Sequence, residues 1–198
     1  QNLNDLLLGK TGVHLAQSGG QGSQTSLFLR ATESDHTLVL VDGVQMTTAT
    51  GAAARLELIP LDQVERIELV RGPRSSIYGS EAIGGVLQVF TRDVGEEAFD
   101  GSLNLTAGTQ STANSNLNLS GKLERTSFGL SYSNKETEGI DSKVGGSPDK
   151  DGFSNDSLAL SIAQQFTKDT ALTLRYSKFN SESEYDDGTV DGDSEQFS

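Results

Sequence analysis

The chain has 198 residues, with 28 aspartates and glutamates against 15 lysines and arginines, which gives a formal net charge of −13 at pH 7. It has no cysteine, so a disulfide and a thiolate metal site are both excluded. Its two histidines, His14 and His36, are too few to assemble a histidine-based zinc centre or a His-dependent triad easily, and we interpret both as structural or solvent-facing.

The apolar runs of the chain are short. Leu6 to Leu8 and Leu38 to Val41 are among the longest, far below the roughly 18 residues that a membrane-spanning helix needs. Any membrane crossing must therefore use β-strands. Gln1 opens directly into mixed sequence, with neither a basic region nor a long apolar segment, so we expect no signal peptide and a mature or trimmed chain.

We predict that residues 1–95 form one domain, an α+β unit with a small mixed sheet. Its apolar segments are irregular in length and spacing. Residues Leu3 to Leu8 indicate a short helix that Gly9 ends, and Pro60 can open a helical turn. Strands are predicted at residues 26–30, 36–41, 64–70 and 86–91.

A sharp corner is predicted between the last two of these strands. Gly72-Pro73 ends the earlier strand, because proline has no amide hydrogen to give to a ladder. Ser75 or Ser76 is expected to cap one helical turn, and Gly79 to supply its left-handed exit.

The pattern of apolar and polar residues changes near residue 100. Polar and mostly acidic residues at 93–100 mark a boundary, and we place a second domain at 101–198. Apolar and polar residues then alternate with a period of two, which predicts antiparallel strands with one apolar face and one face of serine, threonine and asparagine. Periodicity alone does not separate a soluble sandwich from a membrane barrel. The alternating segments are 103–107, 117–120, 128–132, 158–162 and 172–176.

Negative charge gathers in two predicted loops. Short connections at 123–127 and 167–170 lie on one side of the strands, and long ones at 134–157 and 180–198 lie on the other. The long loops hold thirteen acids and three lysines, a bias that excludes a nucleic-acid-binding surface there. They form either a calcium site or solvated acidic segments. Nothing apolar nearby tunes these carboxylates for acid–base chemistry, and we predict that the chain is not an enzyme.

One motif carries more information than the rest of the sequence. It runs Val-Arg-Gly-Pro-Arg-Ser-Ser-Ile-Tyr-Gly-Ser-Glu-Ala-Ile-Gly-Gly-Val-Leu-Gln-Val-Phe-Thr-Arg from Val70 to Arg92, and Leu-Val-Leu-Val-Asp-Gly-Val stands before it at 38–44. This sequence resembles the plug of TonB-dependent outer-membrane receptors, and within them it is most similar to the cobalamin transporter group. The resemblance implies an α+β plug domain followed by antiparallel β-strands of an incomplete transmembrane β-barrel, in the outer membrane of a Gram-negative cell.

The resemblance also implies sites for a ligand and for seating the plug. In the cobalamin group two plug loops touch the corrinoid, and they correspond here to residues 18–25 and 47–53. The candidate ligand-contacting residues are Ser18, Gln24, Thr25, Thr47, Thr48 and Thr50. Four arginines either pair with acids of the barrel wall or are ordinary surface residues. They are Arg30, Arg71, Arg74 and Arg92.

Calcium is implied by the same resemblance. The cobalamin group binds Ca²⁺ through acids of neighbouring extracellular loops, which implies that calcium orders the two acidic loops so that they hold the ligand. The candidate metal ligands are Asp141, Asp149, Asp151, Tyr185, Asp186 and one of Asp191 or Asp193. No redox or organic cofactor is expected.

Parts of the sequence depart from the family pattern. Ala31 stands where the family usually has glycine, and Gln45 where arginine is frequent. The segment that hands a strand to TonB is not among the 198 residues. Five strands are also far fewer than the roughly 22 of such a barrel. We therefore expect the front of a longer receptor.

Three functions stay open at this point. The first is an outer-membrane transporter that takes up cobalamin or another corrinoid, with TonB and membrane lipid as partners. The second is a siderophore or haem receptor of the same architecture. The third is a secreted, calcium-stabilised, β-rich adhesin whose strands form a soluble sandwich, which solubility without detergent would distinguish.

Overall fold

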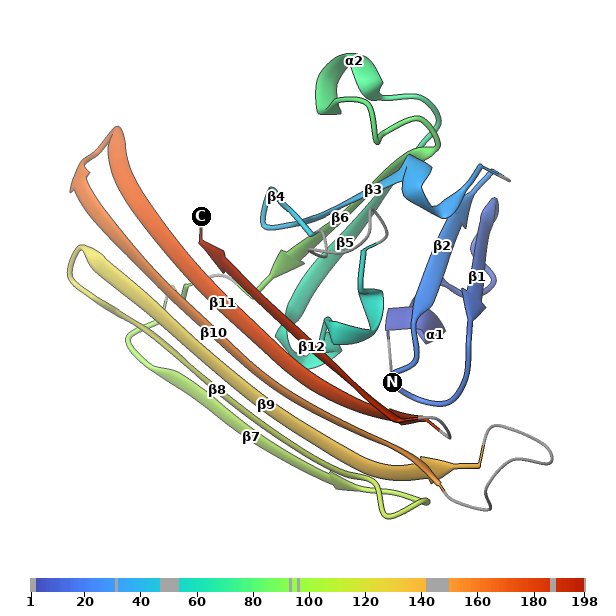
Figure 1. Ribbon diagram of the computed structural model, residues 1–198. Coiled ribbons are helices and arrows are strands. Elements are labelled where there is room, and N and C mark those ends of the chain that lie inside the picture. The colour runs from blue at the N-terminus through green and yellow to red at the C-terminus, as the bar shows by residue number, and fades with distance from the viewer. Residues whose placement is uncertain are drawn as a thin grey trace. The chain divides into compact units, whose positions relative to one another are not determined.

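A computed structural model describes residues 3–30, 32–46, 54–92, 94–95, 97–141, 150–185 and 188–197 (Figure 1). The chain forms two compact units, and each is described by itself. The first comprises residues 1–19 and 23–91, and the second comprises residues 20–22 and 92–198. Within the described residues, no helix is both long enough and apolar enough to cross a membrane.

The first unit contains two small sheets. Its elements are α1 (Leu3–Leu7), β1 (Val13–Gln17), β2 (Thr25–Leu29), η1 (Ser34–His36), β3 (Thr37–Val41), β4 (Val44–Gln45), η2 (Leu56–Leu58), η3 (Leu61–Gln63), β5 (Val64–Arg71), α2 (Ser75–Tyr78) and β6 (Gly85–Thr91). β1 and β2 form an antiparallel hairpin. The other sheet has the order β4-β3-β6-β5, with β3 parallel to β6 and the other pairs antiparallel. It is the mixed sheet that the sequence predicts.

The four-stranded sheet packs around an apolar core. Leu38 of β3, Ala82 and Val86 of β6 belong to one buried apolar cluster, and Val70 of β5 packs against it. Gly85 of β6 stands close to the backbone of β5, since a Cβ on Gly85 would lie 2.4 Å from the carbonyl oxygen of Val70. Only glycine allows this approach without a shift of the backbone.

The corner between β5 and β6 forms near the predicted place. Gly79 ends α2 with a φ of +92°, a conformation that glycine adopts without strain. The predicted serine cap is wrong. The helix begins one or two residues earlier than expected, so Arg74 is the N-cap and Ser75 is already the first helical residue. No side-chain hydrogen bond caps the turn.

The second unit is an antiparallel meander in the order β12-β11-β10-β9-β8-β7 (Figure 1). Its strands are β7 (Asp100–Ala107), β8 (Ala113–Leu123), β9 (Thr126–Ile140), β10 (Asp151–Thr167), β11 (Thr170–Tyr185) and β12 (Gly188–Phe197). Each strand pairs with its neighbour in the sequence. The predicted short connections, β8 to β9 and β10 to β11, are confirmed.

The strands of this unit are longer than predicted. β9, β10 and β11 have 15, 17 and 16 residues, and they extend into the segments predicted as acidic loops. A sixth strand, β12, occupies most of the predicted loop at 180–198. Side chains near these ends are mostly polar on both faces, so the alternation disappears from the sequence. The backbone ladder continues, because its hydrogen bonds need no apolar side chains.

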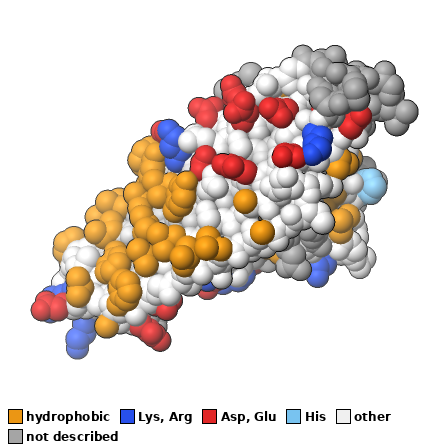
Figure 2. Space-filling model, turned by 90° about the horizontal axis from the view of Figure 1, so that it is seen from below, with side chains coloured by type: hydrophobic (Ala, Val, Ile, Leu, Met, Phe, Trp, Pro, Cys, Tyr) orange, Lys and Arg blue, Asp and Glu red, His pale blue; other side chains and the backbone are white. Residues whose placement is uncertain are grey.

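The register aligns apolar side chains in rows across the strands. One row passes from β7 to β12 through Leu103, Leu117, Tyr132, Leu158, Lys178 and Glu195. The next passes through Gly101, Leu119, Leu130, Leu160, Tyr176 and Phe197. Many of these side chains are exposed, Leu103 at 64% for example. Figure 2 shows hydrophobic side chains gathered over one part of the molecule, with acidic side chains beyond them.

The opposite face of the same sheet is mostly polar and partly buried. One of its rows passes through Asn104, Asn116, Ser133, Ser157, Phe179 and Ser194. Asn116 and Ser157 are each 1% exposed. The second unit therefore exposes apolar side chains on one face and buries polar ones on the other.

Candidate ligand-binding site

The first predicted ligand loop, residues 18–25, connects β1 to β2. Its base is closed by Ser18, whose amide and hydroxyl both donate to the carbonyl oxygen of Gln24, at 3.2 and 3.3 Å. Ser18 and Gln24 are both exposed. A hydroxyl and a carboxamide are thus both available at the surface, and each group can donate and accept hydrogen bonds.

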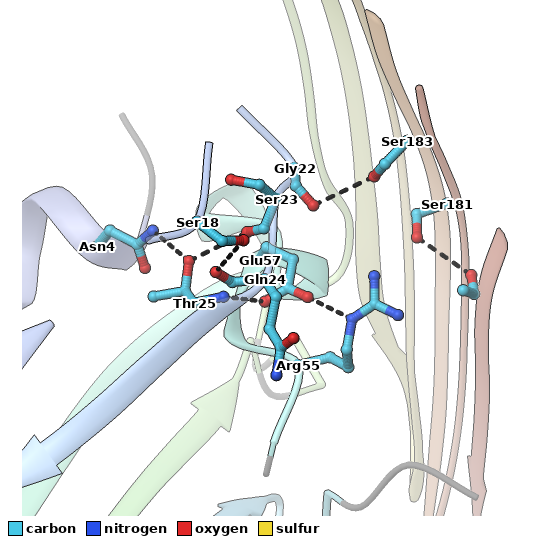
Figure 3. A network of polar contacts seen from close by, with 11 residues as sticks. Asn4, Ser18, Gly22, Ser23, Gln24, Thr25, Arg55, Glu57, Ser181 and Ser183 are labelled. Carbon is cyan, nitrogen blue, oxygen red and sulfur yellow. Dashed lines mark hydrogen bonds and ion pairs between the residues drawn. The ribbon is translucent and has the colours of Figure 1, made fainter. Parts of the chain in front are cut away.

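Thr25, the third predicted contact in this loop, is 1% exposed. Its hydroxyl accepts a hydrogen bond from Nδ2 of Asn4 at 3.0 Å and donates to the carbonyl oxygen of Ser23 at 3.3 Å (Figure 3). The hydroxyl is therefore engaged inside the unit, where it supports the loop. A ligand contact by Thr25 stays a prediction.

A buried carboxylate lies beneath the base of the loop. Oε2 of Glu57 accepts a hydrogen bond from the amide of Thr25 at 3.3 Å, and Oε1 forms an ion pair with Nε of Arg55 (Figure 3). The side chains of Arg55 and Glu57 are 18% and 3% exposed. Burial raises the pKa of Glu57, and hydrogen bonds from its own amide and from Arg55 oppose that shift.

Residues 20–22, the tip of the same loop, belong to the second unit. The carbonyl oxygen of Gly22 accepts a hydrogen bond from Oγ of Ser183 at 3.2 Å (Figure 3). Gly22 has a φ of +82°, and a Cβ on it would lie 1.9 Å from Cδ2 of Phe153. Phe153 and Ser183 stand directly opposite each other on β10 and β11. This pair holds the tip, and alanine at position 22 would displace the phenyl ring.

The second predicted ligand loop lies outside the described residues, and with it Thr47, Thr48 and Thr50. The segment that follows in the sequence is well anchored. Leu56 and Leu58 of η2 are 1% and 2% exposed.

The predicted calcium ligands that the structure describes belong mainly to strands. Asp151 opens β10 and Tyr185 closes β11. Asp191 and Asp193 lie on β12, the strand that the prediction lacked, and Asp141 directly follows β9. Two further candidates, Asp149 and Asp186, lie outside the described residues. The calcium site stays a prediction.

Among the residues that the structure describes, one group of acids and histidine is close enough to share an ion. It consists of Glu33, Asp35 and His36 at η1, in the first unit. None of the three is buried, and none is a predicted ligand. Exposed acidic groups of this kind are common without an ion, so we assign no metal to it.

Four glutamates line a hollow of about 470 Å³ near the ends of β9, β10 and β11. Glu136 and Glu138 come from β9, and Glu182 and Glu184 from β11. Glu138 forms an ion pair with Lys150. Negative charge is thus concentrated at this end of the second unit, as the sequence predicts, but strand residues carry much of it.

The four candidate seating arginines are all exposed; they are Arg30, Arg71, Arg74 and Arg92. Arg30 has a φ of +53°, and its amide donates to the carbonyl oxygen of Gly12 at 3.0 Å. Arg30 therefore helps to close the end of the β1–β2 hairpin. Pairing of these arginines with acids of a barrel wall stays a prediction.

Several residues of this site were not predicted from the sequence. Asn4, Glu57 and Arg55 support the loop from within the first unit, and Phe153 and Ser183 hold its tip. No local signal marks Glu57 as buried. It stands between two leucines in the sequence, and a glutamate is rarely buried unless it is paired.

A mixed-sheet domain followed by an antiparallel meander with an exposed apolar face defines an outer-membrane β-barrel protein with an N-terminal plug. Residues 1–86 match the family model "TonB-dependent Receptor Plug Domain". The chain belongs to the TonB-dependent receptors, which are outer-membrane proteins of Gram-negative bacteria. The predicted family and fold class are confirmed.

Two curated relatives are vitamin B12 transporters. The chain is 36% identical over 183 residues to the vitamin B12 transporter BtuB of Vibrio vulnificus (strain YJ016), an alignment that covers 91% of this chain and 30% of the relative. It is 35% identical over 199 residues to BtuB of Vibrio cholerae serotype O1 (strain ATCC 39541), with 96% and 32% covered. The chain thus spans about a third of the length of these relatives.

Solved structures of the family share the fold. The crystal structure of the siderophore receptor PirA from Acinetobacter baumannii matches with a TM-score of 0.71 and 25% identity, over 88% of this chain and 28% of that one. The copper transporter OprC matches with a TM-score of 0.77 at 16% identity, over 98% of this chain and 31% of that chain, and shows the fold alone. These relatives are transporters and receptors, and the adhesin hypothesis does not fit the family.

Proposed function

We propose that the full-length receptor takes up cobalamin or a related corrinoid across the outer membrane, with energy supplied through TonB. The observation that carries this proposal is the 35–36% identity to two vitamin B12 transporters over 91–96% of the chain. The similarity extends through the plug and the strands that follow it, so it includes the loop at 18–25. In this proposal the chain is not an enzyme.

The chemistry of the loop fits a ligand rich in amides. Ser18 and Gln24 present a hydroxyl and a carboxamide at the surface, and a corrinoid carries several peripheral amides that donate and accept hydrogen bonds. The base of the loop is closed before any ligand arrives, because Ser18 is already bonded to Gln24. A preformed loop loses less entropy on binding.

Calcium is part of the proposal. The acid-rich end of the second unit concentrates carboxylates on neighbouring strands, where like charges repel one another. A bound Ca²⁺ would offset this repulsion and hold this end of the second unit in one conformation. The ligands of the ion remain the predicted set around Asp151 and Tyr185.

A ferric-siderophore receptor is the second candidate. It is favoured by the similarity of the chain to the siderophore receptor PirA, whose fold it shares at 25% identity. The two candidates differ in ligand chemistry. A ferric siderophore is commonly anionic, and the acid-rich end of the second unit would repel it.

The test is equilibrium binding to the full-length receptor in detergent. Cyanocobalamin, a ferric catecholate siderophore and haem are titrated separately, each with Ca²⁺ and with a chelator. Tight binding of cyanocobalamin that weakens on chelation is the expected result. Binding of the siderophore or haem in preference to cyanocobalamin would overturn the corrinoid assignment, and equal affinity with and without Ca²⁺ would overturn the calcium role.

A further inference from the structure

Glu57 has no part in the function proposed above, although it is a buried acid. It lies in η2 between Leu56 and Leu58, which are 1% and 2% exposed. The two leucines anchor the turn in the core of the first unit, and they leave the Glu57 side chain 3% exposed. A carboxylate removed from water in this way must recover hydrogen bonds from the protein.

The two oxygens of this carboxylate serve different parts of the chain. Oε1 pairs with Nε of Arg55, which is local, and Oε2 accepts from the amide of Thr25, 32 residues away. Thr25 is the last residue of the loop at 18–25, and Asn4 holds its hydroxyl from the other side. Glu57 therefore ties the end of this loop to the turn at η2.

We propose that Glu57 is a positioning residue, which fixes Thr25 and thereby orients the exposed Ser18 and Gln24 toward the ligand. This inference rests on the proposed function. Glu57 itself does not touch the ligand. Its effect is to keep the loop in the conformation that binds, so that little free energy is lost in ordering the loop when the ligand arrives.

The chain contains a matched comparison for this pair. Arg66 and Glu68 have the same spacing as Arg55 and Glu57, and their side chains meet at 3.0 Å. They lie on β5 of the same unit, but they are 59% and 47% exposed. An exposed pair of this kind contributes little, because water replaces each partner when the other is removed.

The experiment compares variants of the full-length receptor in detergent. Hydrogen exchange of residues 18–25 reports on the loop without any ligand, and the dissociation rate of cyanocobalamin reports on binding. In Glu57→Ala we expect both rates to rise about tenfold, since a buried amide loses its acceptor. Glu57→Gln is expected to restore part of the loss, because a carboxamide oxygen still accepts from Thr25. Glu68→Ala is expected to change neither rate.

A folded Glu57→Ala variant with unchanged exchange and unchanged dissociation would overturn the proposal, as would equal effects of Glu57→Ala and Glu68→Ala. If Glu57→Ala does not fold, the test is a comparison of Glu57→Gln with Glu68→Gln. We then expect the exchange and dissociation rates to rise in Glu57→Gln, by less than in Glu57→Ala, and to stay unchanged in Glu68→Gln. If the wild-type receptor binds no cyanocobalamin, the proposed function fails. The exchange rates alone then decide whether Glu57 fixes the loop.

Discussion

In the first unit most apolar side chains of β6 are buried, whereas in the second unit those of β7 are exposed. Val86 and Leu87 are both 0% exposed, while Leu103 and Leu105 are 64% and 72% exposed. On the opposite face of the second unit it is a polar side chain, that of Asn116, that is 1% exposed. The first unit is built like a domain that hides apolar surface from water, and the second like a wall whose apolar face meets lipid.

This comparison predicts unequal effects of truncating two leucines. Leu87→Ala leaves a cavity in the first unit and is expected to destabilise it by about 2–5 kcal/mol. Leu105→Ala removes a side chain that is 72% exposed and leaves no cavity, so its effect is expected to be below about 1 kcal/mol. Hydrogen exchange of β6 and β7 in urea measures both. Similar losses at the two sites would contradict the contrast between the units.

A charge on the apolar face of the second unit tests the role of lipid. Leu174→Arg is expected to destabilise the folded barrel by roughly 2–4 kcal/mol, because an arginine would face hydrocarbon. The control is Thr173→Arg, on the opposite face, which already carries Arg175. Folding of the full-length receptor into lipid vesicles at graded denaturant measures the difference. Equal effects would mean that lipid does not cover this face.

A second glycine, Gly43, serves as a control that distinguishes the steric effect of a side chain at position 22 from the effect of backbone strain. Gly22 and Gly43 have φ values of +82° and +84°, but a Cβ on Gly43 would meet nothing within 4 Å. Alanine strains the backbone at both positions by about 1 kcal/mol. Gly22→Ala also displaces Phe153, which is expected to add roughly 1–3 kcal/mol. Thermal unfolding measures both variants, and Phe153→Ala should rescue part of Gly22→Ala. Equal costs for the two glycines would refute the contact.

The smallest expected effect is a pH dependence that arises from Glu57. Burial raises its pKa above the value of 4.5 that applies to an exposed glutamate. The contribution of protonated Glu57 to the free energy of unfolding is therefore fully present below the pKa that Glu57 has in the unfolded chain. It is lost as pH rises from that value through the higher pKa of the folded state. Denaturant unfolding at several pH values should show this decline in the wild type but not in Glu57→Gln. Parallel curves for the two proteins would exclude the shift.

The regular parts of both units could be predicted because their signals are local. Alternation located β7 to β11, and Gly72-Pro73 located the end of β5. The signal fails where alternation ends. β12 is mostly polar, and only its pairing with β11 makes it a strand.

The supports of the candidate site depend on partners that are distant in the sequence. Glu57 meets Thr25 across 32 residues, and Ser183 meets Gly22 across 161. No local pattern fixes such pairs, because the turns and registers between them must be known first. The resemblance to a known family located the loop itself, but its supports became visible only in the structure.

The row that begins with Leu103 passes through three more apolar or aromatic residues and then reaches Lys178 and Glu195, which form an ion pair at 2.7 Å. One row farther on, the apolar side chains continue through Tyr176 to Phe197. The edge of the apolar surface therefore runs at an angle to the direction of the interstrand hydrogen bonds. Because a bilayer surface is flat, the strands must be tilted relative to the membrane normal. The order of side chains along the rows is enough to show this tilt.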